Sequence, residues 1–559
     1  MPCVSAIMLL VSVPACASTT VPPGLAVSPE NAAPVLEVSS DIAIASTQSG
    51  RVQGFVKSGI QTFRGVPYAT AARFAPPTAP QSWDGVRPAL SYGNICPQPV
   101  SAGLSEPQTF LSDWRFWPQS ENCLNLNVWT PALDEQKRPV MVWFHGGGFF
   151  SGSSMELPVY DGENLSRMGD VVVVSVNHRL NILGFLDLSA YGEQYQSSGN
   201  AGLQDLVAAL EWVRDNAAAF GGDPDNVTIF GQSGGGGKVS TLLGAPFAAG
   251  LFDKAIIMSG AMGGPEGRAG LQDLARRVTE RTFVRAGLEP GDIAGLQALP
   301  YAALETAGAQ ALMDISREMS GNQGSAGGLG FPRANWGPVE DGAFLPRGAF
   351  AGGAPSISAN VPLLIGSTLS EFQHINPRIA GHASWSDEQL NAYLQTNYGE
   401  RATSLVAAFR EAYPERPLHQ ILEIDAGGRS GALGLALAKS RQLAPVYNYL
   451  FAWRSPVLDY GWAAGHTSDV AFVFNNAALG IQSSGGGPRV DRLTRLMTQS
   501  WINFARSGNP NADELAEWPR FTQSQSATMI FDDAPYVGTG HDAELIALLG
   551  TAGLAATRP

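Results

Sequence analysis

The sequence predicts an α/β fold with a mostly parallel, doubly wound central sheet, and two observations carry this prediction. First, short apolar runs rich in β-branched residues are typical of strands that are buried on both faces of a sheet. These runs lie at 138–145, 171–176, 227–230, 255–260 and 361–366. Second, helical patterns stand between them, such as the stripe of apolar residues over 203–219. Strands that alternate with helices favour parallel pairing.

The composition indicates one large domain, for which we expect the bounds 46–545. The chain has 559 residues, 44% of them hydrophobic, so it can bury a large core. It shows no internal repeat and no charged linker. The net charge is -14 without a basic cluster, which argues against a nucleic-acid partner and indicates solubility.

The first 17 residues resemble an export signal, because a short apolar run ends in Ala15-Cys16-Ala17. The basic start that such signals usually carry is missing. Alternatively, Cys16 is a lipoprotein acceptor that anchors an exported chain. Residues 18–45 lack periodicity and predict a mobile arm. No other stretch has the length of a membrane-spanning helix.

The remaining elements follow in order. Strand-like patterns begin at Gly50 and continue through 63–69 and 124–130, and a late strand is expected at 446–453. An amphipathic helix is expected at 493–506. Residues 262–345, with a glycine-rich break at 320–330, and residues 375–440 predict helical insertions that cover the active site and shape its entrance.

The turn after the strand at 227–230 carries the first candidate for chemistry. Gly231, Gln232, Ser233, Gly234 and Gly235 form a Gly-x-Ser-x-Gly pattern between a strand and a helical pattern. This is the layout of a nucleophile elbow, a turn so tight that the serine takes a strained conformation. In a chain with 64 glycines the pattern also fits a plain glycine-rich turn, so the other residues must decide.

A serine hydroxyl needs a base within hydrogen-bond reach. Elbow enzymes place the acid and then the histidine after the serine in the chain. That order excludes His145 and His178 among the seven histidines, and we expect His145 to structure the glycine loop instead. His466 lies just beyond the expected strand at 446–453, where a base carried past a strand end would be.

The acid that orients the imidazole should also follow a strand. Glu371 fits, because it comes shortly after the strand at 361–366. Its role would be to hold the tautomer and to stabilise the imidazolium. Asp341 and Asp469 are the other candidates, and a solvated carboxylate is the alternative for Glu371.

Donors for a developing oxyanion are the third requirement. Three glycines, 146 to 148, follow the strand at 138–145, and glycines let backbone N–H groups approach a substrate. We expect the amides of Gly147, Gly148 and Gly234 to form the oxyanion hole.

Beyond the leader, Cys96 and Cys123 are the remaining cysteines, 27 positions apart. In an exported chain they most simply form one disulfide, and two buried thiols are the alternative.

Taken together, these motifs resemble the type-B carboxylesterase/lipase family, the cholinesterase-like branch of the α/β-hydrolases. The resemblance covers roughly residues 47 to 540. The matching stretches are 63–69, 121–129, 145–149, 177–185, 231–235, 258–260, 366–371, 466–474 and 501–510.

The resemblance implies roles for further residues. It implies that Ser233, Glu371 and His466 form the catalytic triad, and that Cys96 and Cys123 form a disulfide. It also implies two structural ion pairs, Arg73 with Glu121 and Arg179 with Asp205, and support of the acid by Ser259. A solvated surface is the alternative for the charged residues.

Two positions depart from the family pattern. The residue before the nucleophile is usually glutamate, whereas Gln232 is neutral, which weakens the case for a cationic substrate of the choline type. The residue after the nucleophile is usually alanine, and we expect Gly234 to loosen the elbow and leave more room.

The sequence therefore predicts a serine carboxylesterase that works through an acyl-enzyme on a small-molecule ester, with no metal and no organic cofactor. The same machinery could act on amides, carbamates, or lipid or polymeric esters. A non-catalytic binding member of the family is the alternative from another class. The sequence does not indicate an oligomeric state.

Overall fold

The computed structural model describes residues 35–99, 106–261, 272–320, 334–351, 353–372, 381–458 and 464–553. The expected leader at 1–17, with Cys16, lies outside these ranges, as does most of the glycine-rich break at 320–330.

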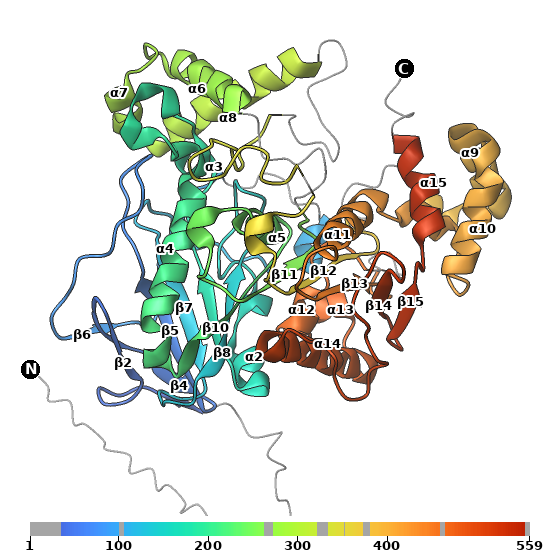
Figure 1. Cartoon of the computed structure of the whole chain (residues 1–559), viewed down its shortest axis with the longest axis horizontal. Helices are drawn as coiled ribbons and strands as arrows, with labels where there is room; N and C mark the ends of the chain where they lie inside the picture. The colour runs from blue at the N-terminus through green and yellow to red at the C-terminus, as the bar shows by residue number, and fades with distance from the viewer. Residues whose placement is uncertain are drawn as a thin grey trace, which may run out of the picture.

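A 12-stranded sheet forms the centre of the described chain, in the order β1-β4-β5-β7-β9-β8-β10-β11-β12-β13-β14-β15 (Figure 1). The neighbours from β9 to β14 pair in parallel, and the flanking pairs are antiparallel. This is the predicted mostly parallel α/β sheet. The strands are β1 Leu36–Glu37, β4 Phe55–Lys57, β5 Ile60–Pro67, β7 Asn125–Thr130, β8 Arg138–Phe144, β9 Val172–Val176, β10 Gly222–Gln232, β11 Lys254–Met258, β12 Leu363–Thr368, β13 Val446–Phe451, β14 Ala527–Phe531 and β15 Tyr536–Thr539. A separate three-stranded sheet holds β2 Ile44–Thr47, β3 Gly50–Gln53 and β6 Val86–Pro88.

Helices cover both faces of the large sheet, and side chains alternate between the two cores. Along β8, Val140 and Val142 join the core that contains the apolar side of α4 (Ala201–Asn216). Met141 and Trp143 point to the other core, which contains the apolar side of α14 (Pro488–Ser507). The alternation follows from the period of two in a strand, and burial of both faces explains why the central strands are apolar throughout.

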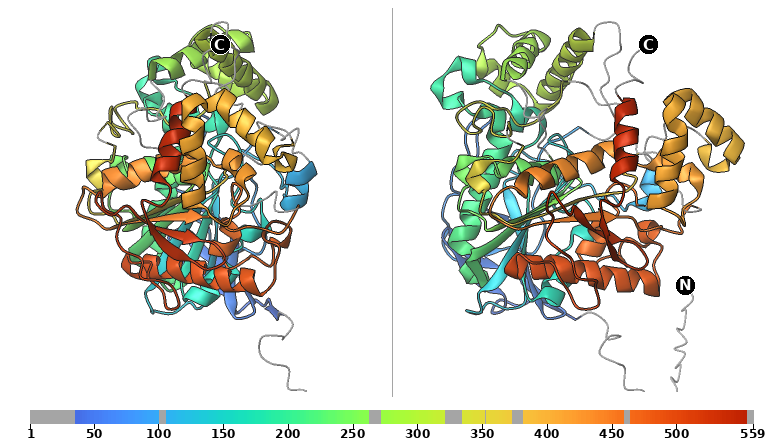
Figure 2. Two further views of the ribbon diagram at one scale, coloured as in Figure 1. Left: turned by 90° about the vertical axis from the view of Figure 1, so that its right-hand side faces the viewer. Right: turned by 45° about the vertical axis from the view of Figure 1, so that its right-hand side comes forward.

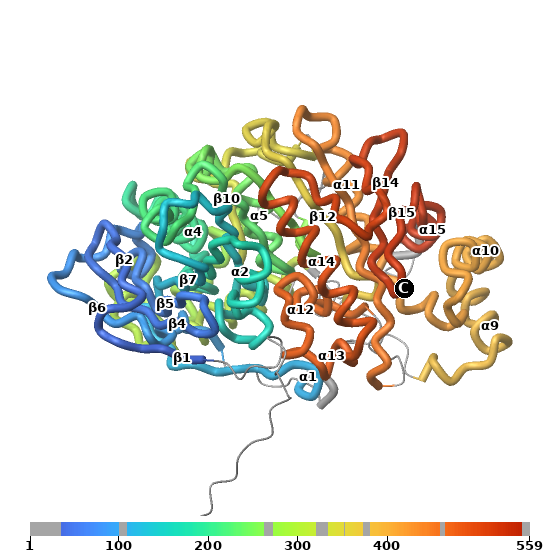
Figure 3. Tube along the Cα trace, turned by 90° about the horizontal axis from the view of Figure 1, so that it is seen from below, coloured from blue at the N-terminus to red at the C-terminus, as the bar shows by residue number. Residues whose placement is uncertain are grey.

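The two predicted helical regions form separate groups. The first contains α6 (Gln272–Ala286), α7 (Ile293–Ala298) and α8 (Tyr301–Ser320), which lie together at one end of the molecule (Figure 1). The second contains α9 (Asp387–Tyr398) and α10 (Ala402–Ala412), which project from the side in Figure 2, and α11 (Ala426–Lys439), which packs on β12. The other helices are α1 Glu106–Leu111, α2 Glu163–Gly169, α3 Asn181–Phe185, α5 Gly234–Leu242, α12 Val470–Val473, α13 Ile481–Ser484 and α15 Ala543–Gly553. The short α1 and α13 are neighbours although far apart in sequence (Figure 3).

The structure corrects three expectations about segment limits. The arm expected to reach residue 45 ends before Leu36, because β1 pairs with β4 and β2 pairs with β3. The domain continues past residue 545, since α15 runs to Gly553 and packs on α10 and α11. The region expected to be mainly helical up to residue 345 has no helix over 334–345, where the carboxylate of Asp341 accepts the N–H groups of Ala343, Phe344 and Leu345.

In the part of the chain that the structure describes, no helix combines the length and the apolar character needed to cross a bilayer. Cys96 and Cys123 form a disulfide that closes a loop of sequence separation 27, and both residues are buried.

Replacing both cysteines, Cys96→Ala with Cys123→Ala, is expected to lower the free energy of unfolding by about 3.5 kcal/mol, the loop-closure entropy for a loop of this length. Urea denaturation of the variant and of the oxidised parent measures the difference. Identical unfolding midpoints would show that the crosslink does not stabilise the fold.

Candidate active site

Four loops meet at one edge of the sheet. Gly146 to Gly148 follow β8, Ser233 follows β10, Glu371 follows β12 and His466 follows β13. These strands are parallel and stand close together in the order β8-β10-β11-β12-β13. Because the carboxyl ends of parallel strands share one edge, segments more than 200 residues apart in sequence converge there.

Ser233 occupies a strained turn between β10 and α5. Its backbone has φ 57° and ψ -125°, a region that side-chain-bearing residues rarely adopt and that costs about 1 to 3 kcal/mol. Its N–H donates to the carbonyl of Met258 at 2.8 Å, and its own carbonyl accepts from the N–H of Gly237 at 2.9 Å. These bonds hold the turn at its sharpest point, directly before the first amides of the helix.

The glycine loop needs its glycines. Gly147 has φ 76° and Gly148 has φ 62°, so side chains at both positions would be strained. A Cβ on Gly147 would overlap the carbonyl of Ser151, and one on Gly148 would lie 2.5 Å from the ring of Phe150. Within the described residues, no hydrogen bond uses the amides of these two glycines, so both remain able to donate.

Gly234 does not leave spare room, contrary to the expectation from the sequence. A Cβ there would overlap the Gly148 carbonyl and lie 2.5 Å from the Gly148 nitrogen. The glycine loop therefore occupies the space that an alanine methyl would need. The backbone of Gly148 therefore lies against Gly234 at the start of α5.

Glu371 and His466 form a buried hydrogen-bonded pair through Oε2 and Nδ1. The other carboxylate oxygen accepts the N–H of Thr368 at 2.9 Å, and the Glu371 carbonyl accepts the N–H of His466 at 2.8 Å. The two loops are thus joined by both backbone and side chains. The acid is fixed on Nδ1, so Nε2 is the ring nitrogen on the side of Gln232 and the elbow.

Two contacts to the imidazole were not anticipated from the sequence. The ring of Phe372 lies 4.0 Å from the imidazole, centroid to centroid, at an angle of 34°. The amide nitrogen of Gln232 lies 3.3 Å from Nε2 and 3.4 Å from Nδ1 of His466. No sequence signal reveals these contacts, because they depend on where the loop after β13 folds back.

The structure does not join the Ser233 hydroxyl to the imidazole, since the hydrogen bonds of these described residues include none between them. Catalytic hydrogen bonds are often long or misaligned without substrate and tighten in the complex. The imidazole does lie next to the elbow, through its contact with residue 232.

The other candidate acids have different partners. Asp341 accepts from the N–H groups that follow it and from the amide of Asn200. Asp469 accepts from the Tyr449 hydroxyl at 2.8 Å, and burial raises the pKa of its carboxyl to about 7. Among the residues that the structure describes, the hydroxyl of Ser259 is buried and has no hydrogen-bond partner, so it does not support the acid there.

Both expected structural ion pairs are formed. Arg73 holds Glu121 through Nε and Nη2 and also donates to the carbonyl of Leu299. Arg179 and Asp205 are fully buried and joined by bonds of 2.7 and 2.8 Å. These pairs tie the loop after β5 to the helices rather than taking part in the site.

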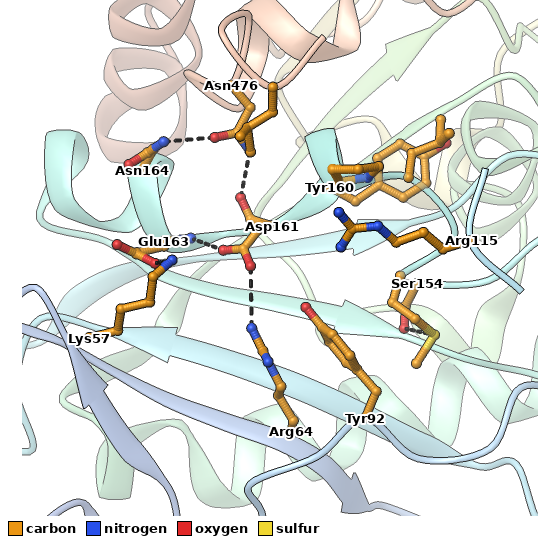
Figure 4. A pocket seen from close by; sticks show the side chains of 14 residues that line it. Lys57, Arg64, Tyr92, Arg115, Ser154, Tyr160, Asp161, Glu163, Asn164 and Asn476 are labelled. Atoms are coloured by element: carbon orange, nitrogen blue, oxygen red, sulfur yellow. Dashed lines mark hydrogen bonds and ion pairs between the residues drawn. The ribbon is translucent and has the colours of Figure 1, made fainter. Parts of the chain in front are cut away.

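A cavity of about 330 Å³ lies elsewhere, between β4, β5 and α2 (Figure 4). None of the three triad candidates lines it. Its cations already have acidic partners, as Lys57 pairs with Glu163 at 2.6 Å and Arg64 with Asp161 at 3.5 Å. It is therefore distinct from the edge of the sheet that carries the candidate chemistry.

Comparisons with known proteins agree with this geometry. A family model described as the carboxylesterase family matches residues 41–544. The para-nitrobenzyl esterase of Bacillus subtilis (strain 168) is 35% identical over 498 residues, covering 88% of this chain and 94% of the relative. The phenmedipham hydrolase of Pseudarthrobacter oxydans is 34% identical over 514 residues, covering 88% and 95%.

Solved structures extend the likeness to three dimensions. An esterase from the anaerobe Clostridium hathewayi that can hydrolyse aliphatic aromatic polyesters superposes with a TM-score of 0.82 at 37% identity, covering 93% of this chain and 100% of that one. The fold, the family match and the share of the chain that it covers lead to one conclusion: this chain belongs to the carboxylesterase family and is a serine carboxylic ester hydrolase with the α/β-hydrolase fold.

Proposed function

We propose that Ser233 is the nucleophile of this esterase and that His466 and Glu371 complete its triad. The observation that carries the proposal is the buried Glu371–His466 pair beside a serine in a strained elbow. His466 takes the proton from the Ser233 hydroxyl as it attacks the ester carbonyl, and then gives it to the leaving alcohol. Water repeats the sequence on the acyl-enzyme and releases the acid.

The amides of Gly147, Gly148 and Gly234 stabilise the oxyanion in both steps. Support comes from the N–H groups of Gly147 and Gly148, which make no hydrogen bond within the described residues, and from the close approach of Gly234 to Gly148. Fixed donors cost no reorganisation when the charge develops, which is why such groups contribute strongly to the rate.

Ser233→Ala is expected to lower kcat by about 10⁴-fold or more, because the acyl-enzyme cannot form. Hydrolysis of a chromogenic acetate ester measures the loss. Ser259→Ala is the matched control: Ser259 also follows a central strand with a left-handed backbone, φ 51°, and its hydroxyl has no hydrogen-bond partner in the described part of the chain. It should retain activity within about threefold. Near-full activity of Ser233→Ala would remove the nucleophile assignment.

Glu371→Gln keeps the shape of the acid but removes the charge that stabilises the imidazolium, so kcat should fall by about 10³ to 10⁴-fold with little change in KM. Asp469→Asn tests the rival acid and should cost far less. A larger loss of kcat in Asp469→Asn than in Glu371→Gln would reverse the assignment.

Small carboxylic esters are the first candidate substrates, and a series of esters of increasing acyl length measures the pocket. Matched ester and amide substrates decide whether amides or carbamates are also cleaved.

A second candidate class, polymeric esters, is favoured by the likeness to the enzyme that can hydrolyse aliphatic aromatic polyesters. Phe116 offers a surface for such a polymer, because 75% of the residue is exposed.

If polymers are substrates, Phe116→Ser should slow the release of acids from an aliphatic aromatic polyester film by about twofold or more through loss of apolar contact. It should leave kcat/KM for a soluble ester unchanged, and Ser233→Ala should release nothing. No release by the parent enzyme would exclude polymeric substrates.

We also propose export, supported by a disulfide that fits an oxidising compartment. N-terminal sequencing of the protein recovered outside the cytoplasm tests whether the leader is removed. Detection of a lipid on Cys16 tests the anchor separately.

A further inference from the structure

A buried lysine stands directly behind the glycine loop. Lys238 belongs to α5, five residues after the elbow serine, and its side chain is completely buried. Its ammonium group donates to the carbonyl of His145 at 2.8 Å and lies 3.4 Å from the carbonyl of Gly146. A buried lysine must be hydrogen-bonded to offset the loss of water, and these two backbone oxygens are its partners.

The position of these carbonyls relates Lys238 to the oxyanion hole. The carbonyl of Gly146 and the N–H of Gly147 belong to the same peptide group. A cation that binds the carbonyl polarises that group and strengthens the N–H as a donor. The next peptide group, which joins the carbonyl of Gly147 to the N–H of Gly148, is also bound at its carbonyl. That carbonyl accepts from the N–H of Ser151 at 3.0 Å.

The surroundings of the ammonium group act on its pKa in opposite directions. Burial lowers the pKa of Lys238 to about 7, and the nearby carboxylate of Glu156 raises it. Burial likewise raises the pKa of Glu156, to about 7, and the charge of Lys238 acts against this rise. The imidazoles of His145 and His178 stack beside this site, and burial with the charge of Lys238 keeps their pKa values well below the usual range. Lys238 therefore contacts the start of the loop directly, and the carboxylate of Glu156 favours its charged form.

We propose that Lys238 is a positioning residue for ester hydrolysis: its ammonium group fixes the glycine loop and strengthens the N–H of Gly147 as an oxyanion donor. This inference rests on the proposed function, because it takes the glycine loop to be the oxyanion hole. A lysine that only stabilises the fold is the competing explanation, and Lys439 provides the comparison. It is also buried, donates to the carbonyl of Ser358 and lies at the far end of α11.

Lys238→Met retains the apolar stem and removes the charge and the donors. We expect kcat to fall about 10- to 100-fold, less than the loss of a direct oxyanion donor, with KM changed less than about threefold. The inhibition constant of a trifluoromethyl ketone, whose serine adduct carries the oxyanion, should rise by the same factor as kcat falls. The matched control Lys439→Met should lower thermal stability but keep kcat within about twofold. Equal kcat values for the two folded variants would overturn the proposal.

A second measurement stands if Lys238→Met does not fold. Glu156→Gln leaves Lys238 in place and removes the carboxylate that raises its pKa. Lys238 then loses its proton at lower pH, so the fall of kcat on the alkaline side should begin at lower pH than in the parent. Superimposable pH profiles would contradict the role of the charge.

The experiments distinguish failure of the proposed triad from failure of the proposed role of Lys238. If Ser233→Ala is inactive while Lys238→Met matches Lys439→Met, the proposed triad stands and the role of Lys238 is wrong. If Ser233→Ala stays active, the site itself is misassigned.

Discussion

The site depends on one close approach, that of the first turn of α5 to the glycine loop after β8. Side chains at Gly234 or Gly235 would overlap the backbone of residues 144 to 148. With glycines there, the start of the helix and the loop touch backbone to backbone. This contact lies next to Ser233, the residue that precedes the helix. The proposed oxyanion donors and the placement of Ser233 depend on this contact.

The surrounding structure supplies what this contact requires. The parallel strands β8 and β10 are in register up to the residues where the loop and the elbow begin, so the two turns start at the same level of the sheet. Apolar cores on both faces hold that register. The strain at Ser233 is small beside the packing that opposes its release, so the elbow keeps its shape without a ligand. Lys238 binds the loop from the buried side, through the carbonyls of His145 and Gly146.

The central strands, the elbow and the order of the site residues were predictable, because short-range patterns encode them: β-branched runs for buried strands, and glycines where a side chain would not fit. The strand β14, which pairs with β13, was not predicted. Its residues, Ala527 to Phe531, form only a short run, and no helical pattern separates them from β15. The contacts of Phe372 and Gln232 with the His466 imidazole were also not predicted. The same holds for the hydrogen bonds from Lys238 to the glycine loop. Each joins segments that become neighbours only after folding, and the sequence around each residue gives no periodic or spacing signal. The expectation of extra room beside Gly234 was wrong for the same reason. The glycine loop that fills this space follows another strand, β8.

The most direct test is a crystal structure of the enzyme inactivated by an alkyl phosphonate. We predict a bond from phosphorus to the Ser233 oxygen, a phosphoryl oxygen about 3 Å from the amides of Gly147, Gly148 and Gly234, and the His466 imidazole within hydrogen-bond reach of the adduct. Phosphorus on another residue, or a phosphoryl oxygen directed away from the glycine loop, would contradict the account.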